Sequence, residues 1–244
     1  MSDDSDRLSE LREELDRDQQ RQQRAQAAIG PVEARDEGGS IAVSLDADGA
    51  IAKVTVREAW RGEHGEEGLA GAIMAVYADA ASKRMEAWGH GLEDEAPGPV
   101  RAPEPGNAEA MLKLVEERGA SVPATQALEA LDAMLDEMLE GIDAAFDIAT
   151  ARGKAEHEGK SSSGAVRAVV VGAGGLASVA FRSGWLKNRH SFNISREVNE
   201  AIQSATKAAR AATPADPLAG TPLERLSSQA ADPEAIAARL RLIG

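Results

Sequence analysis

The chain has 244 residues, a net charge of −14 and a hydrophobic fraction of 43%. This apolar content is enough for a folded core in one or two domains. The absence of cysteine excludes disulfides, thiolate metal sites and thiol nucleophiles. The negative charge opposes non-specific binding to nucleic acid or anionic lipid, because both require a cationic surface.

The N-terminal segment, residues 1–20, is acidic and lacks the apolar core of a signal peptide. No stretch approaches the length of consecutive apolar residues that a membrane span requires. We therefore expect a cytoplasmic protein that makes no membrane contact. The four histidines (His64, His90, His157 and His190) never share a helix face at metal-ligand spacing, so we expect no metal or cofactor.

The first part of the chain predicts a helix, a three-stranded meander and a second helix. The pairs Gly38-Gly39 and Asp48-Gly49 are typical hairpin turns between β-like segments. Both helices have apolar residues at three- and four-residue spacing. The predicted elements are a helix at 7–29, strands at 32–35, 41–45 and 51–56, and a helix at 66–88.

The same order of elements returns after a Pro- and Gly-rich stretch. A linker is predicted at 89–106 and a short helix at 107–118. The second set of elements comprises a helix at 123–151, strands at 155–158, 165–171 and 176–182, and a helix at 195–212. A Pro- and Ala-rich tail follows, with one helical segment at 233–242. The predicted domains are a first module (1–88), a linker region (89–122), a second module (123–212) and the tail (213–244).

The second module repeats the first at a shift of 125 residues. Arg57 and Trp60 correspond to Arg182 and Trp185, so that VREAW stands opposite FRSGW. From the middle strand through the last helix, the shift also matches apolar positions without a gap. An internal duplication explains this pattern.

A single three-stranded sheet with helices has an exposed edge and a shallow core. Two copies can cover each other around a pseudo-two-fold axis, as identical subunits do. We therefore predict an α+β fold in which the two modules pair within one chain as a pseudo-dimer.

The order of elements resembles that of the YbaB/EbfC family of small bacterial nucleoid-associated proteins. The resemblance is carried by the Gln- and Arg-rich first helix (RDQQRQQRAQ), by the Gly-turned hairpins GGSIAVSLDADGAIAKVTV and SSSGAVRAVVVGAGGLASVAF, and by the C-terminal helices. It covers residues 7–88 and 123–212. The resemblance implies a dimeric fold, DNA binding in the bacterial nucleoid and no enzyme activity. The tandem fusion and the strong acidity are departures from the family.

Two glycine-rich motifs suggest phosphate binding but are better explained as turns. GAGGLA at 172–177 matches G-x-G-x-x-A, but a strand-like SVAF follows it where a dinucleotide site needs a helix. GKSSSG at 159–164 lacks the correctly spaced first glycine of a phosphate-binding loop. We interpret both as hairpin turns, and we expect Trp60 and Trp185 to pack each third strand against the following helix.

Charge differs between the two copies. Residues 30–88 hold 6 Lys/Arg and 11 Asp/Glu, whereas residues 152–210 hold 10 and 4. The helix at 123–151 has seven acids and no base. The candidate DNA-binding residues are the cations of the second copy: Arg167, Arg182, Lys187, Arg189, Arg196, Lys207 and Arg210.

Arg17, Arg21 and Arg24 form a further candidate stripe on the first helix. This stripe could follow DNA phosphates, or it could be a solvated helix face with partners such as Asp16 and Asp18. The cationic region of the second copy also has two interpretations. It is either a phosphate-binding surface or a complement to the acidic first copy that fixes the pairing of the modules.

The sequence leaves two functional hypotheses. In the first, the chain is a non-enzymatic, nucleoid-associated DNA-binding protein. In the second, it is a protein-interaction adaptor or chaperone-like partner that has lost DNA binding, which suits the Met- and Leu-rich helix at 123–146. Further homo-oligomerisation stays open under both. No nucleophile–base pair or carboxylate pair points to an enzyme.

Overall fold

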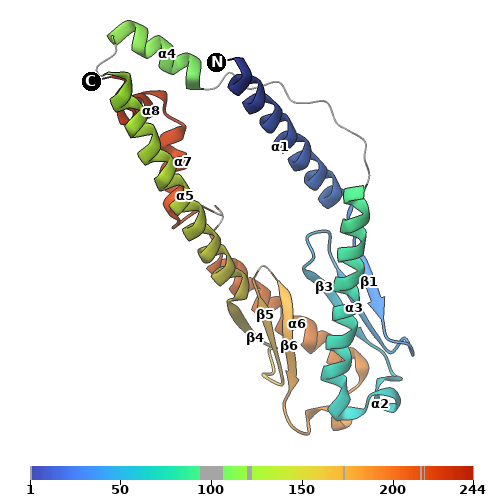
Figure 1. Cartoon of the computed structure of the whole chain (residues 1–244). Helices are drawn as coiled ribbons and strands as arrows, with labels where there is room; N and C mark the ends of the chain where they lie inside the picture. Colours follow the sequence, from blue (N-terminus) through green and yellow to red (C-terminus); the bar gives the residue numbers. More distant parts are fainter. Residues whose placement is uncertain are drawn as a thin grey trace. The chain divides into compact units, whose positions relative to one another are not determined.

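The computed structural model describes residues 2–93, 107–119, 123–172, 174–214, 216 and 218–243. The fold is α+β, with two separate three-stranded antiparallel sheets. The chain divides into two compact units (Figure 1). Unit 1 combines Met1–Arg101 with Gly153–Thr213, and unit 2 combines Ala102–Arg152 with Pro214–Gly244. These units cut across the sequence repeat, because the whole of the helix predicted at 123–151 belongs to unit 2.

The first copy contains the first sheet, with strand order β1-β2-β3. Its elements are α1 (Ser2–Ala28), β1 (Val32–Arg35), β2 (Ile41–Leu45), β3 (Ile51–Val56), α2 (Trp60–Glu63) and α3 (Gly65–Glu93). All three strands have the predicted bounds. Gly39 and Gly49 adopt positive φ in the two turns, as hairpin turns of this kind require. The helix α1 begins earlier than predicted, and α3 continues into the predicted linker.

The second copy contains the second sheet, with strand order β4-β5-β6. Its elements are α5 (Ala124–Lys154), β4 (Glu156–Lys160), β5 (Val166–Val171), β6 (Gly175–Phe181), the 3-10 helix η1 (Trp185–Asn188) and α6 (Ser191–Ala212). Gly172 and Gly174 have positive φ between the antiparallel strands β5 and β6, so the GAGGLA motif is a hairpin turn as predicted. The GKSSSG motif starts within β4 and turns over Ser161–Gly164.

The core of unit 1 draws on both copies. The helix α3 packs on β1 and β2 and also contacts β6, while α6 packs on β4 and β5 and also contacts β3. Buried apolar residues at corresponding positions line the two helices: Leu69, Ile73 and Ala80 on α3, and Ile194, Val198 and Ala205 on α6. Trp60 and Trp185 are 2% and 8% exposed and join the same cluster, which gives them the predicted packing role.

Two side chains of α6 complete the free edge of β3. The side chain of Asn199 accepts a hydrogen bond from Val54 N at 2.8 Å and donates one to Val54 O at 2.7 Å. Ser195 Oγ accepts a hydrogen bond from Val56 N at 2.8 Å. Backbone groups at a sheet edge are otherwise unpaired and can recruit another strand. At a shift of 125 residues, α3 has Ala70 and Met74 at the matching positions, and neither side chain can make this pair of bonds.

Unit 2 contains most of α5 together with α4 (Asn107–Arg118), α7 (Pro222–Ala230) and α8 (Pro233–Arg239). The helix α8 contacts both α4 and α7. The helix α4 has the predicted bounds, and α8 falls within the predicted helical segment of the tail, whereas α7 was not predicted. The rest of the predicted linker, residues 94–106, lies outside the described residues. In the described ranges, no helix is long and apolar enough to span a bilayer.

Candidate functional site

All seven candidate cations of the second copy have exposed side chains. They belong to three parts of the fold. Arg196, Lys207 and Arg210 lie on α6, and Arg182, Lys187 and Arg189 lie in or beside η1, between β6 and α6. Arg167 lies on β5.

The α6 cations form a row on the side of the helix away from the core. At 3.6 residues per turn, Arg196, Lys207 and Arg210 fall within about 60° of arc, opposite the buried Ile194 and Val198. The row extends over about 20 Å. Arg196 is 3.5 Å from Glu197 and 3.6 Å from Glu200, so its charge is partly neutralised.

The cations around η1 follow from the turn that ends β6. Gly184 adopts a positive φ before η1, and Trp185 then turns into the core. The guanidinium of Arg189 lies 5.4 Å from the ring centroid of Trp185, a cation–π contact that leaves its positive charge available to solvent. The exposed Arg182 and Lys187 flank this tryptophan in the sequence.

Arg167 is separate from the other six cations. Its neighbours Val166 and Ala168 on β5 are buried, so Arg167 points to the opposite, solvent-facing side of the second sheet. Its Nε lies 3.3 Å from Glu158 on the adjacent strand β4. The structure therefore does not bring Arg167 together with the cations of α6.

Five of the seven cations, Arg182, Lys187, Arg189, Lys207 and Arg210, form no ion pair with any described residue, and of these only Arg189 contacts an aromatic ring. None of the seven pairs with a carboxylate of the described part of the first copy. When each of the seven is compared with the residue 125 positions earlier in the first copy, only Arg182 has a lysine or arginine as its counterpart, namely Arg57. The cationic surface is therefore specific to the second copy.

The three candidate arginines of α1 have partners within their own helix. Arg17 is 3.1 Å from Glu13, and Arg21 is 2.8 Å from Asp18. Arg24 donates a hydrogen bond to Gln20 at 3.1 Å. These contacts favour the solvated helix face over a phosphate-binding stripe, because pairs of this kind neutralise the charge that a phosphate would need.

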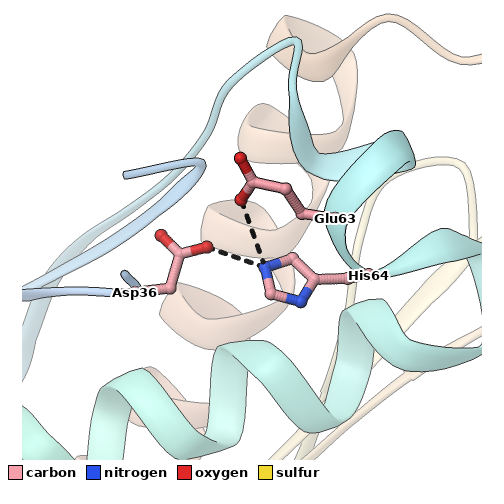
Figure 2. Close-up of side chains that lie close together, drawn as sticks. All are labelled: Asp36, Glu63 and His64. Carbon is pink, nitrogen blue, oxygen red and sulfur yellow. Dashed lines mark hydrogen bonds and ion pairs between the residues drawn. The ribbon is translucent and has the colours of Figure 1, made fainter. Parts of the chain in front are cut away.

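A cluster that the sequence did not indicate lies in the first copy. Asp36 follows β1, and Glu63 and His64 end α2, so residues far apart in the sequence meet beside α3 (Figure 2). His64 Nε2 is 2.7 Å from Asp36 Oδ2 and 3.8 Å from Glu63 Oε2. The three residues help to line an open groove of about 830 Å³. Imidazole and carboxylate groups at such spacing are compatible with a divalent cation.

Comparison with the second copy indicates that Asp36 stabilises the β1–β2 turn. Asp36 accepts hydrogen bonds from Ser40 Oγ at 2.6 Å and Ile41 N at 2.7 Å. Ser161, at the matching position, accepts the equivalent bond from Val166 N at 3.1 Å, although His64 is replaced there by Arg189. We therefore assign the Asp36–His64 contact to holding the β1–β2 turn against α2. No signal in the sequence pairs these two residues, because the contact depends on where α2 ends.

Comparisons of the chain with family models, with curated proteins and with solved structures found no match.

Proposed function

We propose that this chain is a non-enzymatic DNA-binding protein with the architecture of the YbaB/EbfC family, and that its second copy supplies the DNA-binding surface. The observation that carries the proposal is a set of four exposed cations that have neither a carboxylate partner nor an aromatic ring contact among the described residues: Arg182, Lys187, Lys207 and Arg210. Guanidinium and ammonium groups in this state can bind phosphate without first breaking an ion pair.

The proposed architecture is a pseudo-dimer within one chain. Its first support is reciprocity, since α3 contacts β6 of the other copy and α6 contacts β3. Its second support is the hydrogen bond from Arg61 to Leu186 O at 2.8 Å. These two residues are 125 apart, so they are equivalent positions in the two copies of the repeat. Contacts between equivalent residues occur at the axis of a two-fold arrangement.

The proposed surface would bind the DNA backbone without reading sequence. Along the α6 row, duplex DNA presents about a dozen phosphates over about 20 Å. Contacts with phosphates position a protein on the duplex but carry no direct sequence information. The remaining acidic surface of the chain repels DNA, so we expect weak binding that is highly sensitive to salt.

The test is binding of the full chain to a random-sequence duplex of about three helical turns, measured by fluorescence anisotropy across a salt series. The variant carries Arg182→Gln, Lys187→Gln, Lys207→Gln and Arg210→Gln. If all four residues contact phosphates, the slope of log K against log salt should fall by about 3 to 4. We expect the affinity at low salt to fall at least about tenfold.

The comparison variant carries Arg17→Gln, Arg21→Gln and Arg24→Gln, which removes three positive charges from α1. Because these arginines already have partners in their own helix, we expect a much smaller change in affinity. The proposal fails if the full chain does not bind DNA at low salt, or if the two variants weaken binding equally.

A further inference from the structure

The helix α5 exposes a continuous stripe of large apolar side chains. Five of them are 42–71% exposed: Leu128, Leu135, Leu139, Ile142 and Phe146. At 3.6 residues per turn they fall within about 60° of arc and extend over about 27 Å along the helix. We call this surface the α5 stripe. A contiguous exposed apolar surface is uncommon on a protein without a binding partner and marks an interaction site.

The fold of unit 2 covers a different side of α5. Glu137 forms an ion pair with Arg225 of α7 at 2.5 Å and another with Arg239 at the end of α8. A methyl group at Gly141 would lie 2.9 Å from Leu223 Cδ2, which shows how closely α7 approaches. The helices α7 and α8 therefore pack beside the α5 stripe and leave it exposed.

One flank of the α5 stripe is acidic. The helix carries seven acids, and only Glu137 is paired with described residues. The other six all lie on the same side of the stripe at the helical period: Glu129, Asp132, Asp136, Glu140, Asp143 and Asp147. The helix has basic residues only in its last turn, Arg152 and Lys154, so none lies along this row to offset the acids.

The other flank is apolar and contains a pocket. The pocket has a volume of about 280 Å³ and is lined mainly by Met134 and Met138 of α5 and by Leu223, Leu226 and Ile236 of the two C-terminal helices. Met138 borders the α5 stripe. Methionine side chains adapt to differently shaped apolar partners, so this pocket can accept one large side chain of a bound helix.

We propose that the α5 stripe and its adjoining pocket bind a basic amphipathic helix of a partner protein. Apolar residues of that helix would cover the stripe, and one of them would enter the pocket. Lysine or arginine residues along one edge would face the row of six acids, which gives the complex its orientation. This surface is independent of the proposed DNA-binding residues.

The negative charge beside the α5 stripe favours a basic helix over a second copy of this chain and over DNA or anionic lipid. A second copy of α5 would place the two rows of acids near each other, and the repulsion between like charges would oppose the dimer. DNA and anionic lipid are repelled for the same reason. A basic helix is the occupant for which both the apolar stripe and the acidic flank are favourable.

The test uses the full chain and a fluorescent synthetic helix of about 18 residues, made only of leucine and lysine with leucines at three- and four-residue spacing. We expect a dissociation constant on the order of micromolar by fluorescence anisotropy. The variant Leu139→Ser with Phe146→Ser should weaken binding at least about tenfold, because apolar contact area is lost. Both side chains are exposed, so the thermal unfolding midpoint should be unchanged.

Matched controls distinguish specific binding at the α5 stripe from non-specific hydrophobic binding. Phe192→Ser removes an equally exposed phenylalanine from α6 in unit 1 and should leave binding unchanged. Asp136→Asn with Asp143→Asn should weaken binding at low salt and flatten its salt dependence, whereas Glu67→Gln with Glu86→Gln on α3 should do neither. A peptide of the same composition in scrambled order, which cannot form an apolar face, should bind weakly.

Three results would overturn the proposal. The first is equal binding of the scrambled peptide, and the second is equal weakening by Phe192→Ser and by the stripe variant. The third is a dimer of the wild-type chain, detected by light scattering, that the stripe variant dissociates, since this would make a second copy the occupant. None of these measurements involves the four residues on which the proposed DNA binding rests, so the two proposals can fail separately.

Discussion

Among the described residues, Asp36 has the carboxyl group whose ionisation is most strongly tied to the fold. Partial burial raises the pKa of its carboxyl group, but hydrogen bonds from Ser40 Oγ, Ile41 N and His64 lower it more, to about 2. The ionised form is thus favoured in the folded chain. Because the pKa is depressed by folding, its contribution to stability is fully present above the unfolded pKa of about 4 and is lost as the pH falls through about 2.

We expect the variant Asp36→Asn to be less stable than the wild type by about 2 kcal/mol near neutral pH. This difference should shrink between about pH 4 and pH 2, where the wild-type carboxylate becomes protonated. Urea unfolding at a series of pH values measures it. Asp48→Asn, the same chemical change in the exposed β2–β3 turn, serves as control, and a wild-type advantage that persists at about pH 2 would contradict the assignment.

At the level of elements, the contact between β4 and α6 depends on a glycine. A Cβ atom at Gly159 would lie 2.1 Å from Ala205 N and 2.3 Å from Ala201 O. Both are backbone atoms of α6, so no side-chain rotation can relieve the clash. The strand and the helix therefore approach closely because residue 159 has no side chain.

We predict that Gly159→Ala destabilises the chain by about 3 kcal/mol or more, because α6 must move away from the second sheet. The matched control is Gly71→Ala on α3, where a Cβ atom meets nothing within 4 Å. That change should be neutral or slightly stabilising, since alanine favours helix. Thermal unfolding of both variants checks the prediction, and equal midpoints would show that the packing tolerates a methyl group at 159.

The elements differ in how far the sequence determines them. The bounds of β1, β2 and β3 follow from local signals, because glycine-containing turns separate short apolar segments. The start of α6 at Ser191 was missed, because its first residues lack an apolar period. The helix α7 was missed because it has only nine residues within a Pro-rich tail, although Pro222 at its first turn is a start signal.

The candidate site was less predictable than the elements. The cations of the second copy could be named from composition, but the separation of Arg167 from the α6 row depends on which side of β5 faces the core. The contact between His64 and Asp36 spans 28 residues and could not be inferred from spacing. Unit 2 was also missed, because it joins α5 to helices of the tail through contacts such as Glu137–Arg225.

At the level of the whole molecule, unit 1 is built by both copies. Val54 and Val56 of β3 obtain hydrogen-bond partners from Asn199 and Ser195 of α6, and α3 contacts β6. The first copy by itself would leave the edge of β3 unpaired and apolar residues of α3 exposed.

We predict that residues 2–93, expressed alone, do not form a stable folded monomer. The segment should either associate into a dimer that covers β3 or remain largely unfolded, as detected by light scattering and circular dichroism. The full chain under the same conditions is the control. A monomer of residues 2–93 that unfolds cooperatively at a midpoint near that of the full chain would contradict the shared core.

The hydrogen bonds between β3 and the side chains of Asn199 and Ser195 bear on how the sequence of such a protein can evolve. In an assembly of identical subunits, any substitution appears at every equivalent place, so a residue that suits one strand must suit its counterpart. A fused chain is free of this constraint: Asn199 completes one strand while Met74, its counterpart, packs as an apolar residue. Covalent duplication thus lets the two copies differ at positions that identical subunits would have to share.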